Sequence, residues 1–165
     1  MKLKNFILGF IIIGALGTLG HFAYALSGKN TVLGYFTPVN ESTWEHLKLL
    51  FFPTLIFSVF EYFLMKEKPN NYLPSITIAL MIGLISIVTI FYTYSGVLGF
   101  KIEWFNIAIY YISLLIMLIV KTALLSLKFE SKAANWFSLL WIFVMALMFV
   151  FFTYNPLDLG IFKEP

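Results

Sequence analysis

Cysteine and arginine are both absent from this 165-residue sequence, and charged residues make up only 12% of it. Without cysteine, the chain has no disulfide framework, no thiol nucleophile and no thiolate metal ligand. A soluble domain is about 25% charged and about 45–50% apolar, whereas 61% of this chain is hydrophobic. One soluble core of this length cannot hide that much apolar surface, which excludes a soluble enzyme, a nucleic-acid binder and a disordered regulator.

Long apolar runs are what the sequence has in excess. A membrane-spanning helix needs about 20 mostly apolar residues, and five segments meet this requirement: residues 6–26, 41–65, 72–95, 104–127 and 135–154. Each run is continuous, which indicates helices and not the alternating strands of a membrane barrel. We therefore predict an all-α integral membrane bundle of five transmembrane helices, forming a single domain over residues 1–165.

The distribution of lysine predicts the orientation of the bundle. With a cytoplasmic N-terminus, the inner side carries Lys2, Lys4, Lys66, Lys68, Lys128 and Lys132, and the outer side carries only Lys29, Lys101 and Lys163. Lys121 is expected to extend its side chain toward the inner side. The positive-inside rule thus favours the N-terminus inside and the C-terminus outside. Because all basic residues are lysine, which is typical of an AT-rich bacterial genome, we expect a multi-pass protein of the bacterial plasma membrane.

The first span has a second interpretation. Met1–Lys4, followed by an apolar stretch and Ala23-Tyr24-Ala25, resembles a secretory signal peptide with a small-x-small cleavage site. Cleavage after Ala25 would leave four spans and remove His21. A run of about 20 apolar residues is long for a signal peptide and suits a spanning helix, so retention is favoured.

Polar residues are concentrated where the second span begins, in Asn40-Glu41-Ser42-Thr43-Trp44-Glu45-His46-Leu47-Lys48. Ionisable groups at membrane depth are costly and usually face a protein interior or a water-filled cavity. Part of the segment is typical of a helix start: Ser42 and Glu45 fit the S-x-x-E capping box, and Asn40 is an alternative N-cap. Glu41 suits the positive end of the helix dipole. Glu41 and Glu45 share a helix face with Lys48, so they are expected to neutralise it.

Capping does not explain His46, which lies about 100° round the helix from Glu45 and faces a different neighbour. His21 is the natural candidate, because it lies at a similar depth at the outer end of a small-residue face on the first span. The two spans are antiparallel, so we expect the histidines to meet. The candidate catalytic residues are His46, His21 and Glu45, and the candidate substrate-binding residues are Lys48, Asn40, Glu41 and Ser42.

Three functions fit this segment. The first is an enzyme that transfers or hydrolyses the acyl chain of a lipid or lipid-linked substrate, with a histidine as general base and Lys48 holding an anionic headgroup. In a metal-dependent variant His21, His46 and Glu45 would be the ligands, but the nearby lysine disfavours a cation, so no metal or cofactor is assigned. The second is a binding, transport or accessory subunit, and in the third the segment only caps and anchors the helix. Membrane lipids are the expected partners in each case, together with a membrane-protein partner or a second copy of the chain, and no nucleic acid is expected.

The segment also resembles a family of small bacterial multi-span membrane proteins of unassigned function. That family carries a P-V-N-E-S-x-W-E-H-x-K motif, preceded by a histidine near the end of the first span and by a glycine-bearing outer loop. Here the motif extends from Pro38 to Lys48, after His21 and the glycines Gly28 and Gly34. The proline-containing tail, Thr153-Tyr154-Asn155-Pro156, is similar as well. The resemblance implies a five-span fold with a common outer site, and it implies no particular reaction.

Overall fold

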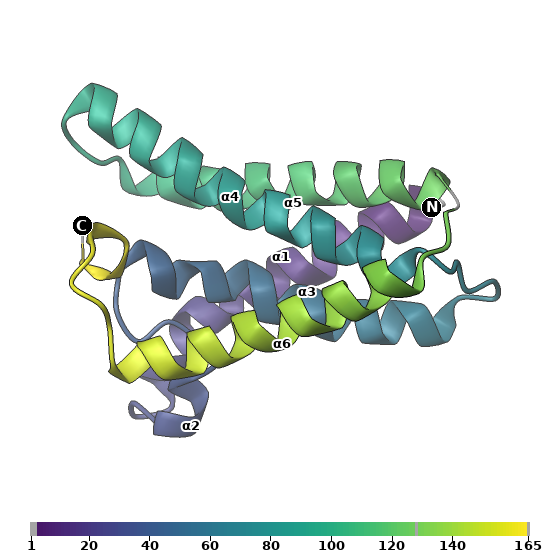
Figure 1. Ribbon diagram of the computed structural model, residues 1–165. Helices are drawn as coiled ribbons and strands as arrows, with labels where there is room; N and C mark the ends of the chain where they lie inside the picture. Colours follow the sequence, from purple (N-terminus) through teal and green to yellow (C-terminus); the bar gives the residue numbers. More distant parts are fainter. Residues whose placement is uncertain (1–2, 128, 165) are drawn as a thin grey trace.

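The computed structural model describes residues 3–127 and 129–164, and these residues form helices and loops without any strand. Five helices are long and apolar enough to cross a membrane: α1 (Leu3–Leu26), α3 (Thr43–Leu64), α4 (Tyr72–Leu98), α5 (Glu103–Ser126) and α6 (Lys132–Tyr154). They are joined by a single-turn helix, α2 (Thr31–Gly34), and a terminal 3₁₀ turn, η1 (Gly160–Phe162) (Figure 1). The chain is thus an all-helical, multi-pass membrane protein, as predicted. Each predicted span agrees with its helix to within three residues at either end.

The start of α1 and the 3₁₀ turn η1 lie at opposite ends of the bundle (Figure 1). The C-terminal tail lies at the same end as α2 and the start of α3, and we call this the α2 end. Two of the lysines on which the predicted orientation depends, Lys2 and Lys128, fall outside the described residues. Which end faces the cytoplasm therefore stays a prediction.

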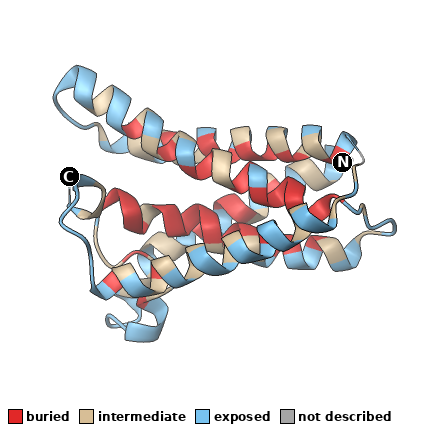
Figure 2. Cartoon of the chain, in the orientation of Figure 1, coloured by how far each residue is buried: buried red, intermediate tan, exposed pale blue. Residues whose placement is uncertain are grey.

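Helix α3 is the buried centre of the bundle, and most of its residues near the α2 end are inaccessible (Figure 2). It packs against α1, α4 and α6, while α4 and α5 pair along their lengths. Apolar side chains from four helices fill the space around it, among them Leu50, Phe51, Leu80, Leu114 and Phe149. Because protein surrounds α3 near the α2 end, the polar residues there must find partners inside the bundle.

The small-residue face predicted on α1 is buried at Gly14 and Gly17. Gly14 faces Tyr111 of α5, and Gly17 brings the face against α3. At Gly17 the approach is closest: a Cβ there would lie 2.6 Å from the backbone carbonyl oxygen of Leu49 and would overlap the hydroxyl of Tyr110. His21 lies one turn farther along the same face of α1. The glycine therefore sets how near His21 comes to the start of α3.

A second group of buried polar residues lies in the half of the bundle away from α2, where it forms an ion pair. Lys121 of α5 pairs with Glu61 of α3, and both side chains are almost fully buried. Tyr72 donates a hydrogen bond of 2.6 Å to the same carboxylate. The expectation that Lys121 extends to the membrane surface is therefore wrong, because an internal carboxylate neutralises it within the bundle.

Candidate functional site

The start of α3 is fixed by side chains of the polar segment. The N-cap Ser42 has extended backbone angles, and its hydroxyl accepts the backbone N–H of Glu45 at 3.3 Å. This cap is the predicted one, but the second half of the predicted capping box differs. Asn40, and not Glu45, accepts the backbone N–H of Ser42, at 3.0 Å. The carboxylate of Glu45 instead accepts the backbone N–H of Val39 at 3.0 Å, so it is turned toward the preceding loop.

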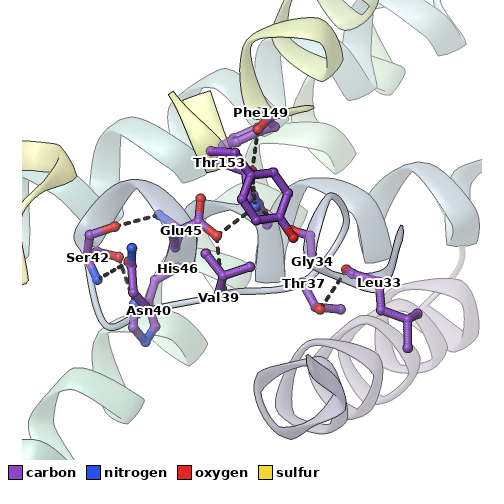
Figure 3. Close-up of polar contacts among 12 residues, drawn as sticks. Leu33, Gly34, Thr37, Val39, Asn40, Ser42, Glu45, His46, Phe149 and Thr153 are labelled. Carbon is purple, nitrogen blue, oxygen red and sulfur yellow. Dashed lines mark hydrogen bonds and ion pairs between the residues drawn. The ribbon is translucent and has the colours of Figure 1, made fainter. Parts of the chain in front are cut away.

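Lys48 and Glu45 form a buried ion pair at 2.6 Å, with side chains that are 0% and 2% exposed. The ammonium group also donates to the carbonyl oxygen of Gly34 at 2.9 Å and to the hydroxyl of Thr153 at 2.6 Å. All three of its N–H groups therefore have an acceptor. Figure 3 shows Glu45 and Thr153 on one side of the start of α3 and His46 on the other. The pair ties α2, α3 and α6 together, and the predicted neutralisation of Lys48 is confirmed for Glu45 alone.

His21, Glu41 and His46 converge on the opposite side of α3. The Nε2 atoms of the two histidines are 3.2 Å apart, which confirms the predicted contact. A carboxylate oxygen of Glu41 lies 3.3 Å from Nε2 of His46 and 3.7 Å from Nε2 of His21. We call these three residues the His–Glu–His cluster. Both histidine side chains are about one-third exposed and that of Glu41 is 66% exposed, so the cluster is open to a ligand.

The ring of His46 is oriented by the backbone. Its Nδ1 atom lies 2.9 Å from the carbonyl oxygen of Ser42. A carbonyl oxygen only accepts hydrogen bonds, so Nδ1 carries the proton. In the neutral ring, Nε2 then presents a lone pair toward His21 and Glu41.

A cavity of about 700 Å³ adjoins the cluster, enclosed by α1, α3, α4, α5 and the C-terminal tail. Its size falls within the range of small-molecule sites, about 300–1,000 Å³. The apolar part of its wall comprises Phe22, Leu49, Ile87, Phe91, Ile107 and Ile109. The polar part comprises the cluster with Thr18, Thr43, Lys101, Glu103, Asn106, Tyr110 and Glu164. A wall of this kind suits an amphiphile, with the cluster beside its polar portion.

The tail helps to close this cavity. Phe162 of η1 stacks on Trp44, with ring centroids 4.9 Å apart, and Trp44 packs in turn on Phe149 of α6 at 4.8 Å. This contact holds the tail against the start of α3. Glu164, two residues after Phe162, then contributes to the cavity wall.

Comparison with known proteins identifies the family to which the chain belongs. Residues 1–165 match the model of a family of unknown function (DUF6512). The chain belongs to this family. No curated protein and no solved structure matches it. Membership agrees with the resemblance to an uncharacterised family and assigns no reaction, so the chemistry must be argued from the site itself.

The structure separates the predicted site residues into two groups. His21, His46 and Glu41 line the cavity. Asn40, Ser42, Glu45 and Lys48 are not part of its wall and make the hydrogen bonds that fix the start of α3. Three further wall residues were not predicted to belong to the site: Lys101, Glu103 and Asn106, which α5 and the loop before it bring to the cavity. Residues so far from the motif in sequence, and without a spacing that links them to it, gave no signal.

Proposed function

We propose that this protein is an enzyme of the bacterial plasma membrane that hydrolyses or transfers the acyl chain of a lipid or lipid-linked substrate. One observation carries the proposal: two histidines and a carboxylate converge on a largely apolar cavity of about 700 Å³ in a membrane bundle. Ionisable groups at such a position are expensive, which favours a functional role over a structural one. The structural demands of the helix start are already met by Ser42, Asn40 and the ion pair.

In the proposed reaction, Nε2 of His46 takes the proton of the nucleophile, which is water or the hydroxyl or amine of an acceptor. The nucleophile bonds to the carbonyl carbon of the substrate, and the ester C–O bond breaks. The imidazolium then returns the proton to the oxygen of the leaving alcohol. The Ser42 carbonyl keeps the required tautomer of His46, and the carboxylate of Glu41 stabilises the imidazolium at 3.3 Å.

In the proposed function, the residue that binds an anionic headgroup is Lys101 and not Lys48, to which the sequence pointed. Lys48 has all three N–H groups occupied inside the bundle, whereas Lys101 is exposed and lies on the cavity wall. The acyl chain would lie along the apolar wall, between Leu49 and Ile107. This arrangement brings the ester, between headgroup and chain, to the level of the cluster.

The proposed substrate comes from the outer leaflet. The loops at the α2 end carry Lys29, Lys101 and Lys163, and more lysines lie at the opposite end, where Lys4, Lys66, Lys68 and Lys132 are described. The positive-inside rule supports a cytoplasmic location for the lysine-rich end. The cavity would then open on the outer side of the membrane.

Turnover in a native lipid mixture tests the proposal. The purified protein is placed in nanodiscs made from a bacterial lipid extract, and new free fatty acids or newly acylated lipids are followed by mass spectrometry. We expect products from the wild type and a loss of at least about a hundredfold in His46→Gln, because general-base catalysis contributes about 10²–10⁴. Glu67→Gln, in the exposed loop between α3 and α4, is the control and should match the wild type.

The outcome also distinguishes the non-enzymatic function. Absence of products from the folded wild type, or equal rates in wild type and His46→Gln, contradicts the enzyme proposal. An intact lipid that remains bound to the wild type without being turned over would instead indicate a binding, transport or accessory subunit.

A further inference from the structure

We propose that the His–Glu–His cluster is a binding site for a divalent zinc ion, with the two Nε2 atoms and a Glu41 oxygen as ligands and a fourth position open for water. This inference rests for its catalytic meaning on the lipid-cleaving function proposed above, but it changes the role of His46. With zinc bound, Nε2 of His46 would be a ligand and not the general base, and the ion would supply the activated nucleophile, a water that ionises near neutral pH. Binding of the ion itself does not require that the protein turns over a lipid. The two proposals can therefore fail separately.

The distances within the cluster fit a tetrahedral ion. Zinc binds imidazole nitrogen at about 2.0–2.1 Å and carboxylate oxygen at about 2.0–2.2 Å, so two ligands at the tetrahedral angle are about 3.3–3.5 Å apart. The three separations in the cluster are 3.2, 3.3 and 3.7 Å. Small adjustments of the exposed Glu41 side chain bring all three donors onto one ion. No backbone movement is needed.

The ligand types favour a transition ion. Two imidazoles and one carboxylate suit zinc, whereas calcium and magnesium prefer sites built from oxygen alone. Three protein ligands with one open position are also the usual composition of catalytic zinc sites, while structural sites are closed by a fourth protein ligand. The adjoining cavity gives that open position access to a substrate.

A hydrogen bond that would orient one of the zinc ligands is already present. A zinc-bound histidine commonly donates its other ring N–H to a carbonyl or carboxylate, which fixes the tautomer and the ring orientation. In His46, Nδ1 makes this bond to the Ser42 carbonyl at 2.9 Å. The N-cap that starts α3 therefore also presents the ligand nitrogen.

Lys48 does not oppose a cation at this site. The sequence alone predicts a positive charge next to the histidines, which would repel a metal ion. In the structure, Lys48 is paired with Glu45 and bound to Gly34 and Thr153. It lies two residues after His46, which is about 200° round α3. The cluster itself contains one carboxylate and no lysine.

Zinc binding to the whole chain tests the site. The protein is purified in detergent, stripped with a chelator, dialysed against zinc chloride, and assayed for zinc by elemental analysis. We expect about one ion per chain in the wild type and in Glu67→Gln, and an affinity more than about a hundredfold lower in His21→Gln, His46→Gln and Glu41→Gln. Glu41→Gln is the key variant, because its exposed side chain makes no contact that the fold needs. Cobalt in place of zinc should give the intense visible absorption of a four-coordinate ion.

Each result is decisive. A folded wild type that binds no stoichiometric zinc, or that binds it as tightly when Glu41 is replaced by glutamine, overturns the metal site. So does a weak, six-coordinate cobalt spectrum. Undiminished lipid turnover by fully chelated protein overturns the catalytic role of the zinc ion and leaves the proposed enzyme, with His46 as its general base, intact. Zinc binding without any lipid turnover overturns the proposed enzyme and leaves the zinc site intact.

Discussion

Replacing Lys48 by methionine should strongly destabilise the protein, although methionine has a similar shape and is more apolar. The substitution leaves the carboxylate of Glu45 only 2% exposed, with the Val39 N–H as its remaining partner. It also removes the donors that bind the Gly34 carbonyl and the Thr153 hydroxyl. Breaking a buried ion pair by removing one partner costs about 3–5 kcal/mol. The unfolding equilibrium should therefore shift by about two to three and a half powers of ten.

Replacing both partners tests whether the unpaired charge is the cause. The double variant Glu45→Gln/Lys48→Met buries no charge, so it should be more stable than Lys48→Met alone. A buried ion pair replaced on both sides is often neutral in stability, whereas the loss of one side is not. The two single changes should thus be strongly non-additive, with a coupling free energy of about 2 kcal/mol or more.

The assay is unfolding by denaturant in mixed micelles, followed by tryptophan fluorescence. Trp44 is a suitable reporter, because it is buried between Phe149 and Phe162 near the pair. Lys66→Met, at an exposed position in the loop after α3, is the matched control and should stay within about 0.5 kcal/mol of the wild type. A Lys48→Met protein within about 1 kcal/mol of the wild type, or strict additivity in the double variant, would show that the ion pair does not stabilise the bundle.

Three further predictions concern α1, the helix cap and the topology. Gly17→Ala should lower the free energy of unfolding by about 1–3 kcal/mol and lower the activity by displacing His21, because its Cβ meets the Leu49 carbonyl. The control Gly96→Ala, whose Cβ meets nothing within 4 Å, should not lower the free energy of unfolding in the same assay. Equal effects of the two variants would show that the close contact at Gly17 does not matter. Ser42→Ala should cost about 0.5–2 kcal/mol through the lost N-cap, and an unchanged unfolding midpoint would show that the cap contributes nothing. A C-terminal alkaline phosphatase fusion should be active and a C-terminal green fluorescent protein fusion dark, because we place the C-terminus outside; the opposite pattern reverses the orientation.

The sequence predicted the features that depend on local chemistry. The five apolar runs gave the spans, Ser42 gave the cap, and depth along antiparallel helices brought His21 to His46. Local chemistry did not predict which of the two carboxylates, Glu41 or Glu45, faces the histidines and which pairs with Lys48. A helix that begins at residue 41 places Glu41 and Glu45 on one face, but α3 begins at Thr43 and Ser42 is extended. Glu41 therefore lies outside the helical repeat and turns to the histidines, while Glu45 turns to Lys48.

The cavity depends on how whole helices pack, which a single sequence does not encode in any local pattern. Lys101 and Glu103 belong to a loop and a helix start that appear unremarkable in the sequence. They reach the cavity only because α4 packs against α3 and α5 packs against α1. The same packing buries Lys121 against Glu61, where a free lysine at the membrane surface was expected.

The central claim, that the His–Glu–His cluster directs a nucleophile to an acyl carbonyl, is tested most directly with isotopic water. The wild type in native-lipid nanodiscs is incubated in ¹⁸O-labelled water, and the released fatty acids are analysed by mass spectrometry beside those from His46→Gln. Hydrolysis predicts one ¹⁸O atom in the carboxyl group of each fatty acid released by the wild type. Acyl transfer predicts an unlabelled, newly acylated lipid, and both products should be lost in the variant. A wild type that forms neither product, or a variant that forms as much as the wild type, would contradict the account.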